Sequence, residues 1–147
     1  MHYEKIARKA DFILAKLKYL KENRPEDVER FRTDETKQMA ILYALQVCIE
    51  AIVDIAILIG TKVYGKEYEG DYEMFESLFE EGIIREDVLE KWRKMNGLRN
   101  AIVHAYASLV LDEIYENYEK ILRDIGYVTD TLVKLIEEGK NEHRERV

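Results

Sequence analysis

The residues best suited to chemistry in this chain lie between Arg99 and His104. Of its three histidines, His2 and His143 lie close to the ends of the sequence, so His104 is the one that a folded domain is expected to hold in place. Histidine exchanges a proton near neutral pH, and arginine offers a planar fork of donors that matches phosphate. Such a pair could exchange a proton with a reacting group and stabilise negative charge that develops on phosphate oxygens. Asn100 could hold the imidazole or a phosphate oxygen.

A helix from about Arg85 to Tyr106 is expected to position these side chains. At about 100° per residue, Asn100 and His104 lie one turn apart on one face. Another face, expected to meet the core, carries Met95, Leu98, Ile102, Val103 and Tyr106. Arg99 projects from the boundary, and its long stem could bring the guanidinium toward His104. The spacing equally allows Arg99 to pair with a carboxylate and His104 to make an ordinary surface hydrogen bond.

The rest of the chain predicts a helical bundle. One proline and seven glycines provide few turns, and apolar residues recur at helical spacing almost throughout. Helices are predicted over Tyr3–Glu22, Thr33–Ile59, Tyr72–Glu81 and 85–106, and from an N-cap at Asp112 to Glu138, with a loop over Lys62–Gly70 and an N-cap at Asp71. The helix 33–59 is apolar on most sides and is expected to be central. Its polar stripe of Gln46, Glu50 and Asp54 favours a solvated edge over a functional role.

Length and composition indicate one domain, residues 1–139, followed by a charged tail, 140–147, that is expected to fray. A net charge of -7 argues against a polybasic surface, so nucleic acid would have to bind at a local patch.

The single cysteine, Cys48, lies in an apolar run and is expected to be buried. Charges within the first twenty residues argue against a signal peptide, and the apolar stretch Ala51–Ile59 is short for a membrane span, so a cytoplasmic location is expected. The sequence contains no Gly-rich phosphate loop and no His/Cys cluster, and it therefore predicts no cofactor or metal.

The segment Gly97–Tyr106 resembles the signature of the HEPN superfamily, in which an arginine is followed after four to six residues by a histidine. More narrowly, it resembles the HepT-like branch, whose motif is Arg-Asn, three residues, His, one residue, Tyr. The surroundings are similar as well, and the resemblance extends from the first helix to about Leu122. Its other parts are Ile41–Ala56, Tyr72–Leu78, Gly82–Ile84 and Leu89–Leu98.

The resemblance implies an all-α, up-and-down bundle of four to five helices that forms a two-fold homodimer. Many family members are metal-independent ribonuclease toxins encoded with an MNT-type nucleotidyltransferase antitoxin. By this resemblance, Arg99 and His104 are the catalytic pair, Asn100 supports them, and Tyr106 accepts AMP from the antitoxin. Apposed motif helices in a dimer would supply two histidines, one for the acid and one for the base. The site would favour single-stranded or exposed RNA.

Two other interpretations stay open. The chain could be a non-catalytic interaction module that binds a nucleotidyltransferase and a nucleotide, since fold alone does not decide function. It could also be a plain helical scaffold. At the level of residues alone, Tyr106 is better explained as an amphipathic core residue with its hydroxyl at the edge. Ordinary packing is favoured over base stacking for Tyr64, Tyr68 and Tyr72, because their loop is acidic.

Overall fold

The computed structural model of the 147-residue chain describes the backbone of residues 2–104 and 108–146, and the side chains within 3–104 and 110–138. Every regular element in this part is helical, which confirms the all-α class. There are seven α-helices in it rather than four to five, because two short helices join the long ones. In chain order they are α1 (His2–Glu22), α2 (Val28–Thr33), α3 (Glu35–Leu58), a π-helical turn η1 (Ile59–Val63), α4 (Asp71–Glu80), α5 (Glu86–His104), α6 (Ser108–Glu116) and α7 (Tyr118–Arg146).

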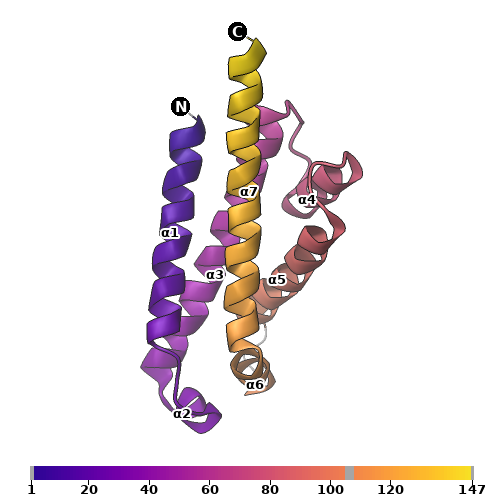
Figure 1. The fold of residues 1–147 in the computed structure, drawn as a ribbon. Coiled ribbons are helices and arrows are strands. Elements are labelled where there is room, and N and C mark those ends of the chain that lie inside the picture. The colour runs from indigo at the N-terminus through magenta and orange to yellow at the C-terminus, as the bar shows by residue number, and fades with distance from the viewer. Residues whose placement is uncertain (1, 105–107, 147) are drawn as a thin grey trace.

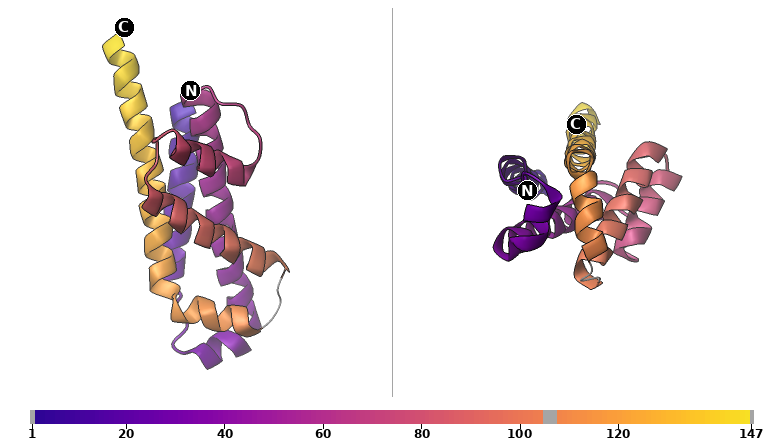
Figure 2. Two further views of the ribbon diagram at one scale, coloured as in Figure 1. Left: turned by 90° about the vertical axis from the view of Figure 1, so that its right-hand side faces the viewer. Right: turned by 90° about the horizontal axis from the view of Figure 1, so that it is seen from below.

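The long helices α1, α3 and α7 run side by side, and α5 crosses α3 and α7 obliquely on the other side of the bundle (Figures 1 and 2). α4 packs above α5 against α3, while α2 and α6 pack together at the opposite end of the molecule. The two ends of the chain lie at the same end of the bundle (Figure 1). This arrangement leaves α5 on the outside, with α3 and α7 beneath it.

α3 is the central helix, as predicted, because its apolar residues are buried on several sides by α1, α5 and α7. Together with η1 it forms a 29-residue helix, Glu35–Val63, which is long and apolar enough to cross a membrane by length and composition alone. The uninterrupted apolar run Ala51–Ile59, on which the prediction from the sequence rested, covers only part of this helix and does not indicate this property. In the bundle, 56% of the most apolar window is buried, as in the core helix of a folded domain.

The expected details of α3 are confirmed. Glu50 and Asp54 are exposed, Gln46 donates to Glu50 at 3.1 Å, and the Lys9 ammonium lies 3.2 Å from Asp54, so this stripe is a solvated edge. Cys48 is fully buried, and burial raises the pKa of its thiol to about 12. A thiol in this state is a small apolar side chain rather than a nucleophile.

The prediction that Asp112 begins the last helix is wrong. Asp112 lies inside α6, where its carboxylate accepts from the Nε and Nη2 of Arg32 at 2.8 and 2.7 Å and ties α6 to α2. The break comes at Asn117, whose amide donates to the Glu113 carbonyl at 2.9 Å. α7 then continues to Arg146, beyond the predicted end at Glu138. The Asp112 carboxylate, which by type could cap a helix, instead forms an ion pair with Arg32 of another helix.

The segment before α4 differs from prediction in a similar way. η1 extends helical backbone through Val63 into the expected loop, and Gly70, not Asp71, is the N-cap of α4. Gly70 has φ 150°, a conformation that residues with a side chain rarely adopt, and a Cβ there would collide with Glu73. The predicted end of this helix at Gly82 is confirmed, since Gly82 has φ 74° just after it.

Candidate active site on helix α5

The N-terminal half of α5 is fixed firmly to α4. The indole of Trp92 stacks on the ring of Phe75, with centroids 4.2 Å apart and planes 11° apart, and both side chains are fully buried. Beside this stack, Arg93 donates to Glu76 at 2.7 Å and to the Tyr72 hydroxyl at 3.3 Å. These bonds lower the pKa of Glu76 and keep Arg93 protonated. Tyr72 is 39% exposed and is held through its hydroxyl, and ordinary packing of this residue stays a prediction.

The same half of α5 is tied to α7. The Tyr127 hydroxyl donates to Asp87 at 2.6 Å, and the Lys91 ammonium lies 5.1 Å from the centre of the Tyr127 ring. The hydrogen bond from Tyr127, helped by Arg85, lowers the pKa of Asp87. Aromatic packing and ion pairs therefore set the position of the helix before the motif begins.

Burial decreases along the C-terminal half of α5. Met95 is fully buried, but Leu98 and Ile102 are only half-buried, and Val103 is 37% exposed. The prediction that Val103 faces the core is therefore wrong for the single protomer. The helix reaches past α4 here, so fewer elements are available to cover it (Figure 2).

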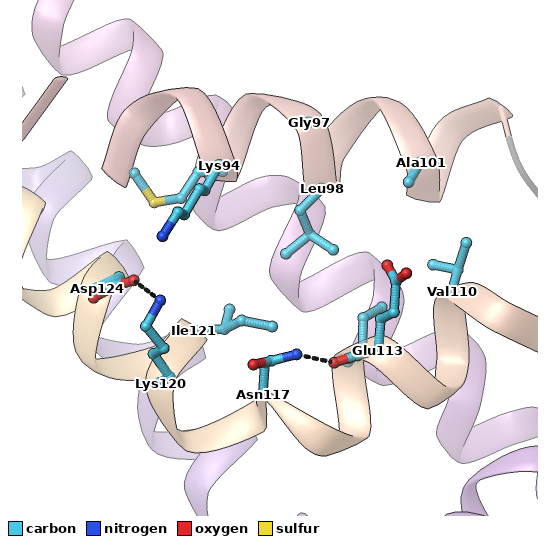
Figure 3. A pocket seen from close by; sticks show the side chains of 12 residues that line it. Lys94, Gly97, Leu98, Ala101, Val110, Glu113, Asn117, Lys120, Ile121 and Asp124 are labelled. Atoms are coloured by element: carbon cyan, nitrogen blue, oxygen red, sulfur yellow. Dashed lines mark hydrogen bonds and ion pairs between the residues drawn. The ribbon is translucent and has the colours of Figure 1, made fainter. Parts of the chain in front are cut away.

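A groove of about 450 Å³ separates this half of α5 from α6 and α7 (Figure 3). On the α5 side it is lined by the apolar side chains of Leu98 and Ala101, and Lys94 projects from the same helix on the side of Asp124 (Figure 3). The remaining lining comes from Met95, Gly97, Val110, Glu113, Ile114, Asn117, Lys120 and Ile121. Arg99 projects about 200° around the helix from Ala101. The groove therefore lies on the flank of α5 opposite Arg99.

The structure places Asn100 and His104 as the sequence predicted, both exposed and one turn apart on one face of α5. His104 is the last residue of the helix. Arg99 is half-buried, and its Nη2 donates to the Oδ1 of Asn96 at 3.1 Å. Its guanidinium is thus directed one turn back along α5, while His104 lies beyond Arg99 in the other direction. One protomer does not bring the two proposed catalytic groups together.

Arg99 has a different electrostatic environment from five of the other seven arginines whose side chains the structure describes; Arg8 and Arg123 resemble it in forming no ion pair within this part of the chain. Five arginines form ion pairs with carboxylates: Arg24, Arg30, Arg32, Arg85 and Arg93. Within the part of the chain that the structure describes, Arg99 forms no ion pair and binds a neutral amide instead. Its charge is therefore available to an anion from outside the protomer.

Two points complete the account of the predicted residues. Tyr106, predicted to accept AMP, lies outside the described residues, as do its neighbours 105 and 107. Asn96, by contrast, was not singled out from the sequence. The three-residue spacing between Asn96 and Arg99, which places two side chains next to each other on a helix, could have identified it.

Comparison with known proteins identifies the class. The family model described as Ribonuclease HepT-like matches residues 13–132, a segment that contains the whole Arg99–His104 motif, and the chain belongs to this family. It is similar to a protein of Archaeoglobus fulgidus that is provisionally named an RNase, with 33% identity over 84% of this chain and 89% of that protein. It is also similar to the mRNA nuclease HepT of Shewanella oneidensis, with 30% identity over 72% of this chain and 80% of that protein.

Solved structures agree with the sequence relatives. One is a toxin–antitoxin complex with AMP-PNP, which matches with a TM-score of 0.76 and 28% identity over 86% of this chain and 96% of that chain. Another is the tri-AMPylated HEPN toxin of Shewanella oneidensis in complex with its MNT antitoxin, with a TM-score of 0.74 and 27% identity over 90% and 96% of the two chains. The resemblance found in the sequence is confirmed, and the chain is homologous to the HepT toxin of MNT/HEPN pairs.

Proposed function

We propose that this protein is a metal-independent endoribonuclease that cleaves single-stranded or exposed RNA, with Arg99 and His104 as its catalytic pair. The observation that carries the proposal is the site on the C-terminal half of α5. There an exposed imidazole and amide accompany an arginine that no carboxylate of the described chain neutralises. Membership of the Ribonuclease HepT-like family gives this constellation its reaction class.

In the proposed reaction, a base removes the proton of the RNA 2′-hydroxyl and its oxygen attacks the adjacent phosphorus. The bond from phosphorus to the 5′-oxygen breaks, and an acid protonates the leaving oxygen. The products are a 2′,3′-cyclic phosphate and a 5′-hydroxyl. Arg99 stabilises the negative charge on the non-bridging oxygens, and Asn100 orients the imidazole or the phosphate.

The reaction needs an acid and a base, but each protomer offers one imidazole in the motif. A two-fold dimer that brings two α5 helices together would provide both and would place two Arg99 side chains in one cleft. The exposure of Val103 and the direction of Arg99, away from His104 of its own chain, support this arrangement. A Val103→Asp variant tests it. We expect sedimentation to show a dimer for the wild type and a weakened dimer for the variant, since a charge on an apolar contact surface is costly.

We further propose that the toxin acts in the cytoplasm and is neutralised by a nucleotidyltransferase partner, which adds AMP to Tyr106. The support is the similar Shewanella oneidensis toxin, which is tri-AMPylated and in complex with an MNT antitoxin. AMP groups two residues beyond His104 would add bulk and negative charge beside the site and repel RNA. After co-expression with such a partner, intact mass should increase by whole AMP units that map to Tyr106. Tight binding without added mass would contradict this step.

The ribonuclease assay is the test of the main proposal. Unmodified protein should cut an unstructured RNA in the presence of a chelator, whereas His104→Ala should not cut and should sediment like the wild type. Intact RNA at protein concentrations where a related HEPN ribonuclease cuts would contradict the proposal. Equal cutting by His104→Ala would show that the assigned site is wrong.

The second candidate is a non-catalytic module that binds a nucleotidyltransferase and a nucleotide. This candidate accounts for the direction of Arg99, away from His104 of its own protomer, without requiring a dimeric active site. The two candidates differ in one result, because a module would bind its partner tightly and leave RNA intact even without modification on Tyr106.

A further inference from the structure

Asn96 holds the guanidinium of Arg99 through one hydrogen bond. The Arg99 Nη2 donates to the Asn96 Oδ1 at 3.1 Å, and both residues are half-buried. They are three residues apart on α5, so their side chains leave the helix about 60° from each other. The bond selects one direction for a side chain that otherwise has many rotamers.

The chemical type of this partner matters as much as its position. When Arg32 meets Asp112, two bonds of 2.8 and 2.7 Å form, and two opposite charges compensate each other. An amide oxygen is uncharged and occupies a single N–H of the five that a guanidinium carries. Asn96 therefore orients Arg99 and leaves its net charge, and most of its donors, for another anion.

We propose that Asn96 is a positioning residue: it holds the Arg99 guanidinium, turned away from His104 of its own protomer, where the scissile phosphate would lie in the proposed two-fold cleft, and it preserves the charge of Arg99. The inference rests on the proposed function, because it takes the ligand of Arg99 to be the RNA phosphate. A donor set in place before the reaction stabilises developing charge without reorganising during it. Asn96 touches neither substrate nor reacting atoms in this account and acts only through Arg99.

Three variants at Asn96 separate orientation from charge. Asn96→Ala removes the acceptor and should lower kcat about tenfold, since misplaced groups lose this much or more. Asn96→Asp keeps the acceptor, but its carboxylate compensates the positive charge of Arg99. This variant should therefore lower kcat about a hundredfold. Asn96→Gln restores an amide at a longer reach and should recover part of what Asn96→Ala loses. The measurement is kcat and KM on an unstructured oligoribonucleotide, with KM changing less than about twofold in each variant.

Two further experiments test whether Asn96 only stabilises the fold: a matched control at another asparagine, and the same Asn96 variant in a protein that lacks the Arg99 guanidinium. Asn23 is also half-buried and donates to the Tyr19 carbonyl at 2.9 Å, at the end of α1 and away from α5, so Asn23→Ala should lower thermal stability and leave kcat unchanged. In an Arg99→Lys background the fork is absent, and adding Asn96→Ala should change kcat by less than about twofold. Melting curves for every variant give the fraction of the protein that is folded, and kcat is calculated per folded molecule.

The outcomes distinguish this inference from the proposed function. Wild-type protein that does not cut RNA overturns both. Wild-type cleavage that depends on His104, together with unchanged kcat in Asn96→Ala and Asn96→Asp, overturns the role of Asn96 and leaves the proposed function intact. Asn96→Asp that cuts as well as Asn96→Gln would show that the charge of the partner is irrelevant, and would also overturn it. The expected order of kcat is wild type, then Gln, Ala and Asp.

Discussion

The two halves of α5 carry one arginine each, and the two arginines have different partners. Arg93, in the N-terminal half, contacts Glu76, Glu90 and Tyr72 and joins α4 to α5. Arg99, less than two turns later, forms no ion pair among the residues described and donates a hydrogen bond to the neutral Asn96. A compensated arginine stabilises the fold, whereas an uncompensated one is a candidate for binding an external anion. The helix thus combines an N-terminal half around Arg93, the anchoring half, with a C-terminal half around Arg99, the chemical half.

The largest effect is expected from damage to the anchoring half. Trp92→Ala should lower the free energy of unfolding by about 3–5 kcal/mol, because it removes a fully buried aromatic side chain and its stack on Phe75. Urea unfolding followed by circular dichroism measures this loss. Trp92→Phe is the control and should lose much less, since the indole N–H has no hydrogen-bond partner in the described chain. Equal losses in the two variants would contradict the packing account.

The chemical half should respond in activity instead. Arg99→Ala should lower kcat/KM for RNA by about 10²–10³-fold, the usual cost of removing one donor that stabilises a transition state. Arg93→Ala is the matched control on the same helix, and it should weaken stability and leave kcat of the folded enzyme unchanged. A comparable loss of activity in both variants would remove the distinction between the halves.

A smaller effect concerns acid stability. Tyr127 and Arg85 lower the pKa of Asp87 below its ordinary value of 3.8, so the folded state holds this carboxylate in the charged form more strongly than the unfolded state does. Its contribution is complete above the ordinary pKa and is lost as the pH falls through the lowered one. Asp87→Asn should therefore reduce the difference between urea midpoints measured at about pH 7 and about pH 3. Tyr127→Phe should reduce it similarly, and an unchanged difference in both would contradict this origin.

The sequence was informative wherever local pattern decides the outcome. Helical spacing correctly predicted the long helices and the central position of α3. It also predicted that Asn100 and His104 lie on one exposed face. It failed where a distant residue decides. Asp112 is a good N-cap by type, but Arg32 of α2 takes its carboxylate. Val103 follows the apolar period, but α5 projects past the elements that would cover it.

The candidate site was predictable to the same extent. Residue types and the family motif located it, and periodicity gave the faces of α5. The direction of Arg99 was not predictable, because a long side chain at a boundary can turn either way, and its partner Asn96 lies on the side away from His104. Whether a guanidinium is compensated depends on which carboxylates the tertiary fold brings near it.

The chemistry of the cleaved ends tests the central claim most directly. Unmodified wild-type protein, incubated with a defined RNA and a chelator, should yield 2′,3′-cyclic phosphate and 5′-hydroxyl ends, which only attack by the 2′-oxygen produces. His104→Ala should yield neither. Ends with a 5′-phosphate, cleavage that requires a divalent metal, or cyclic-phosphate ends at the wild-type rate from His104→Ala would contradict the account.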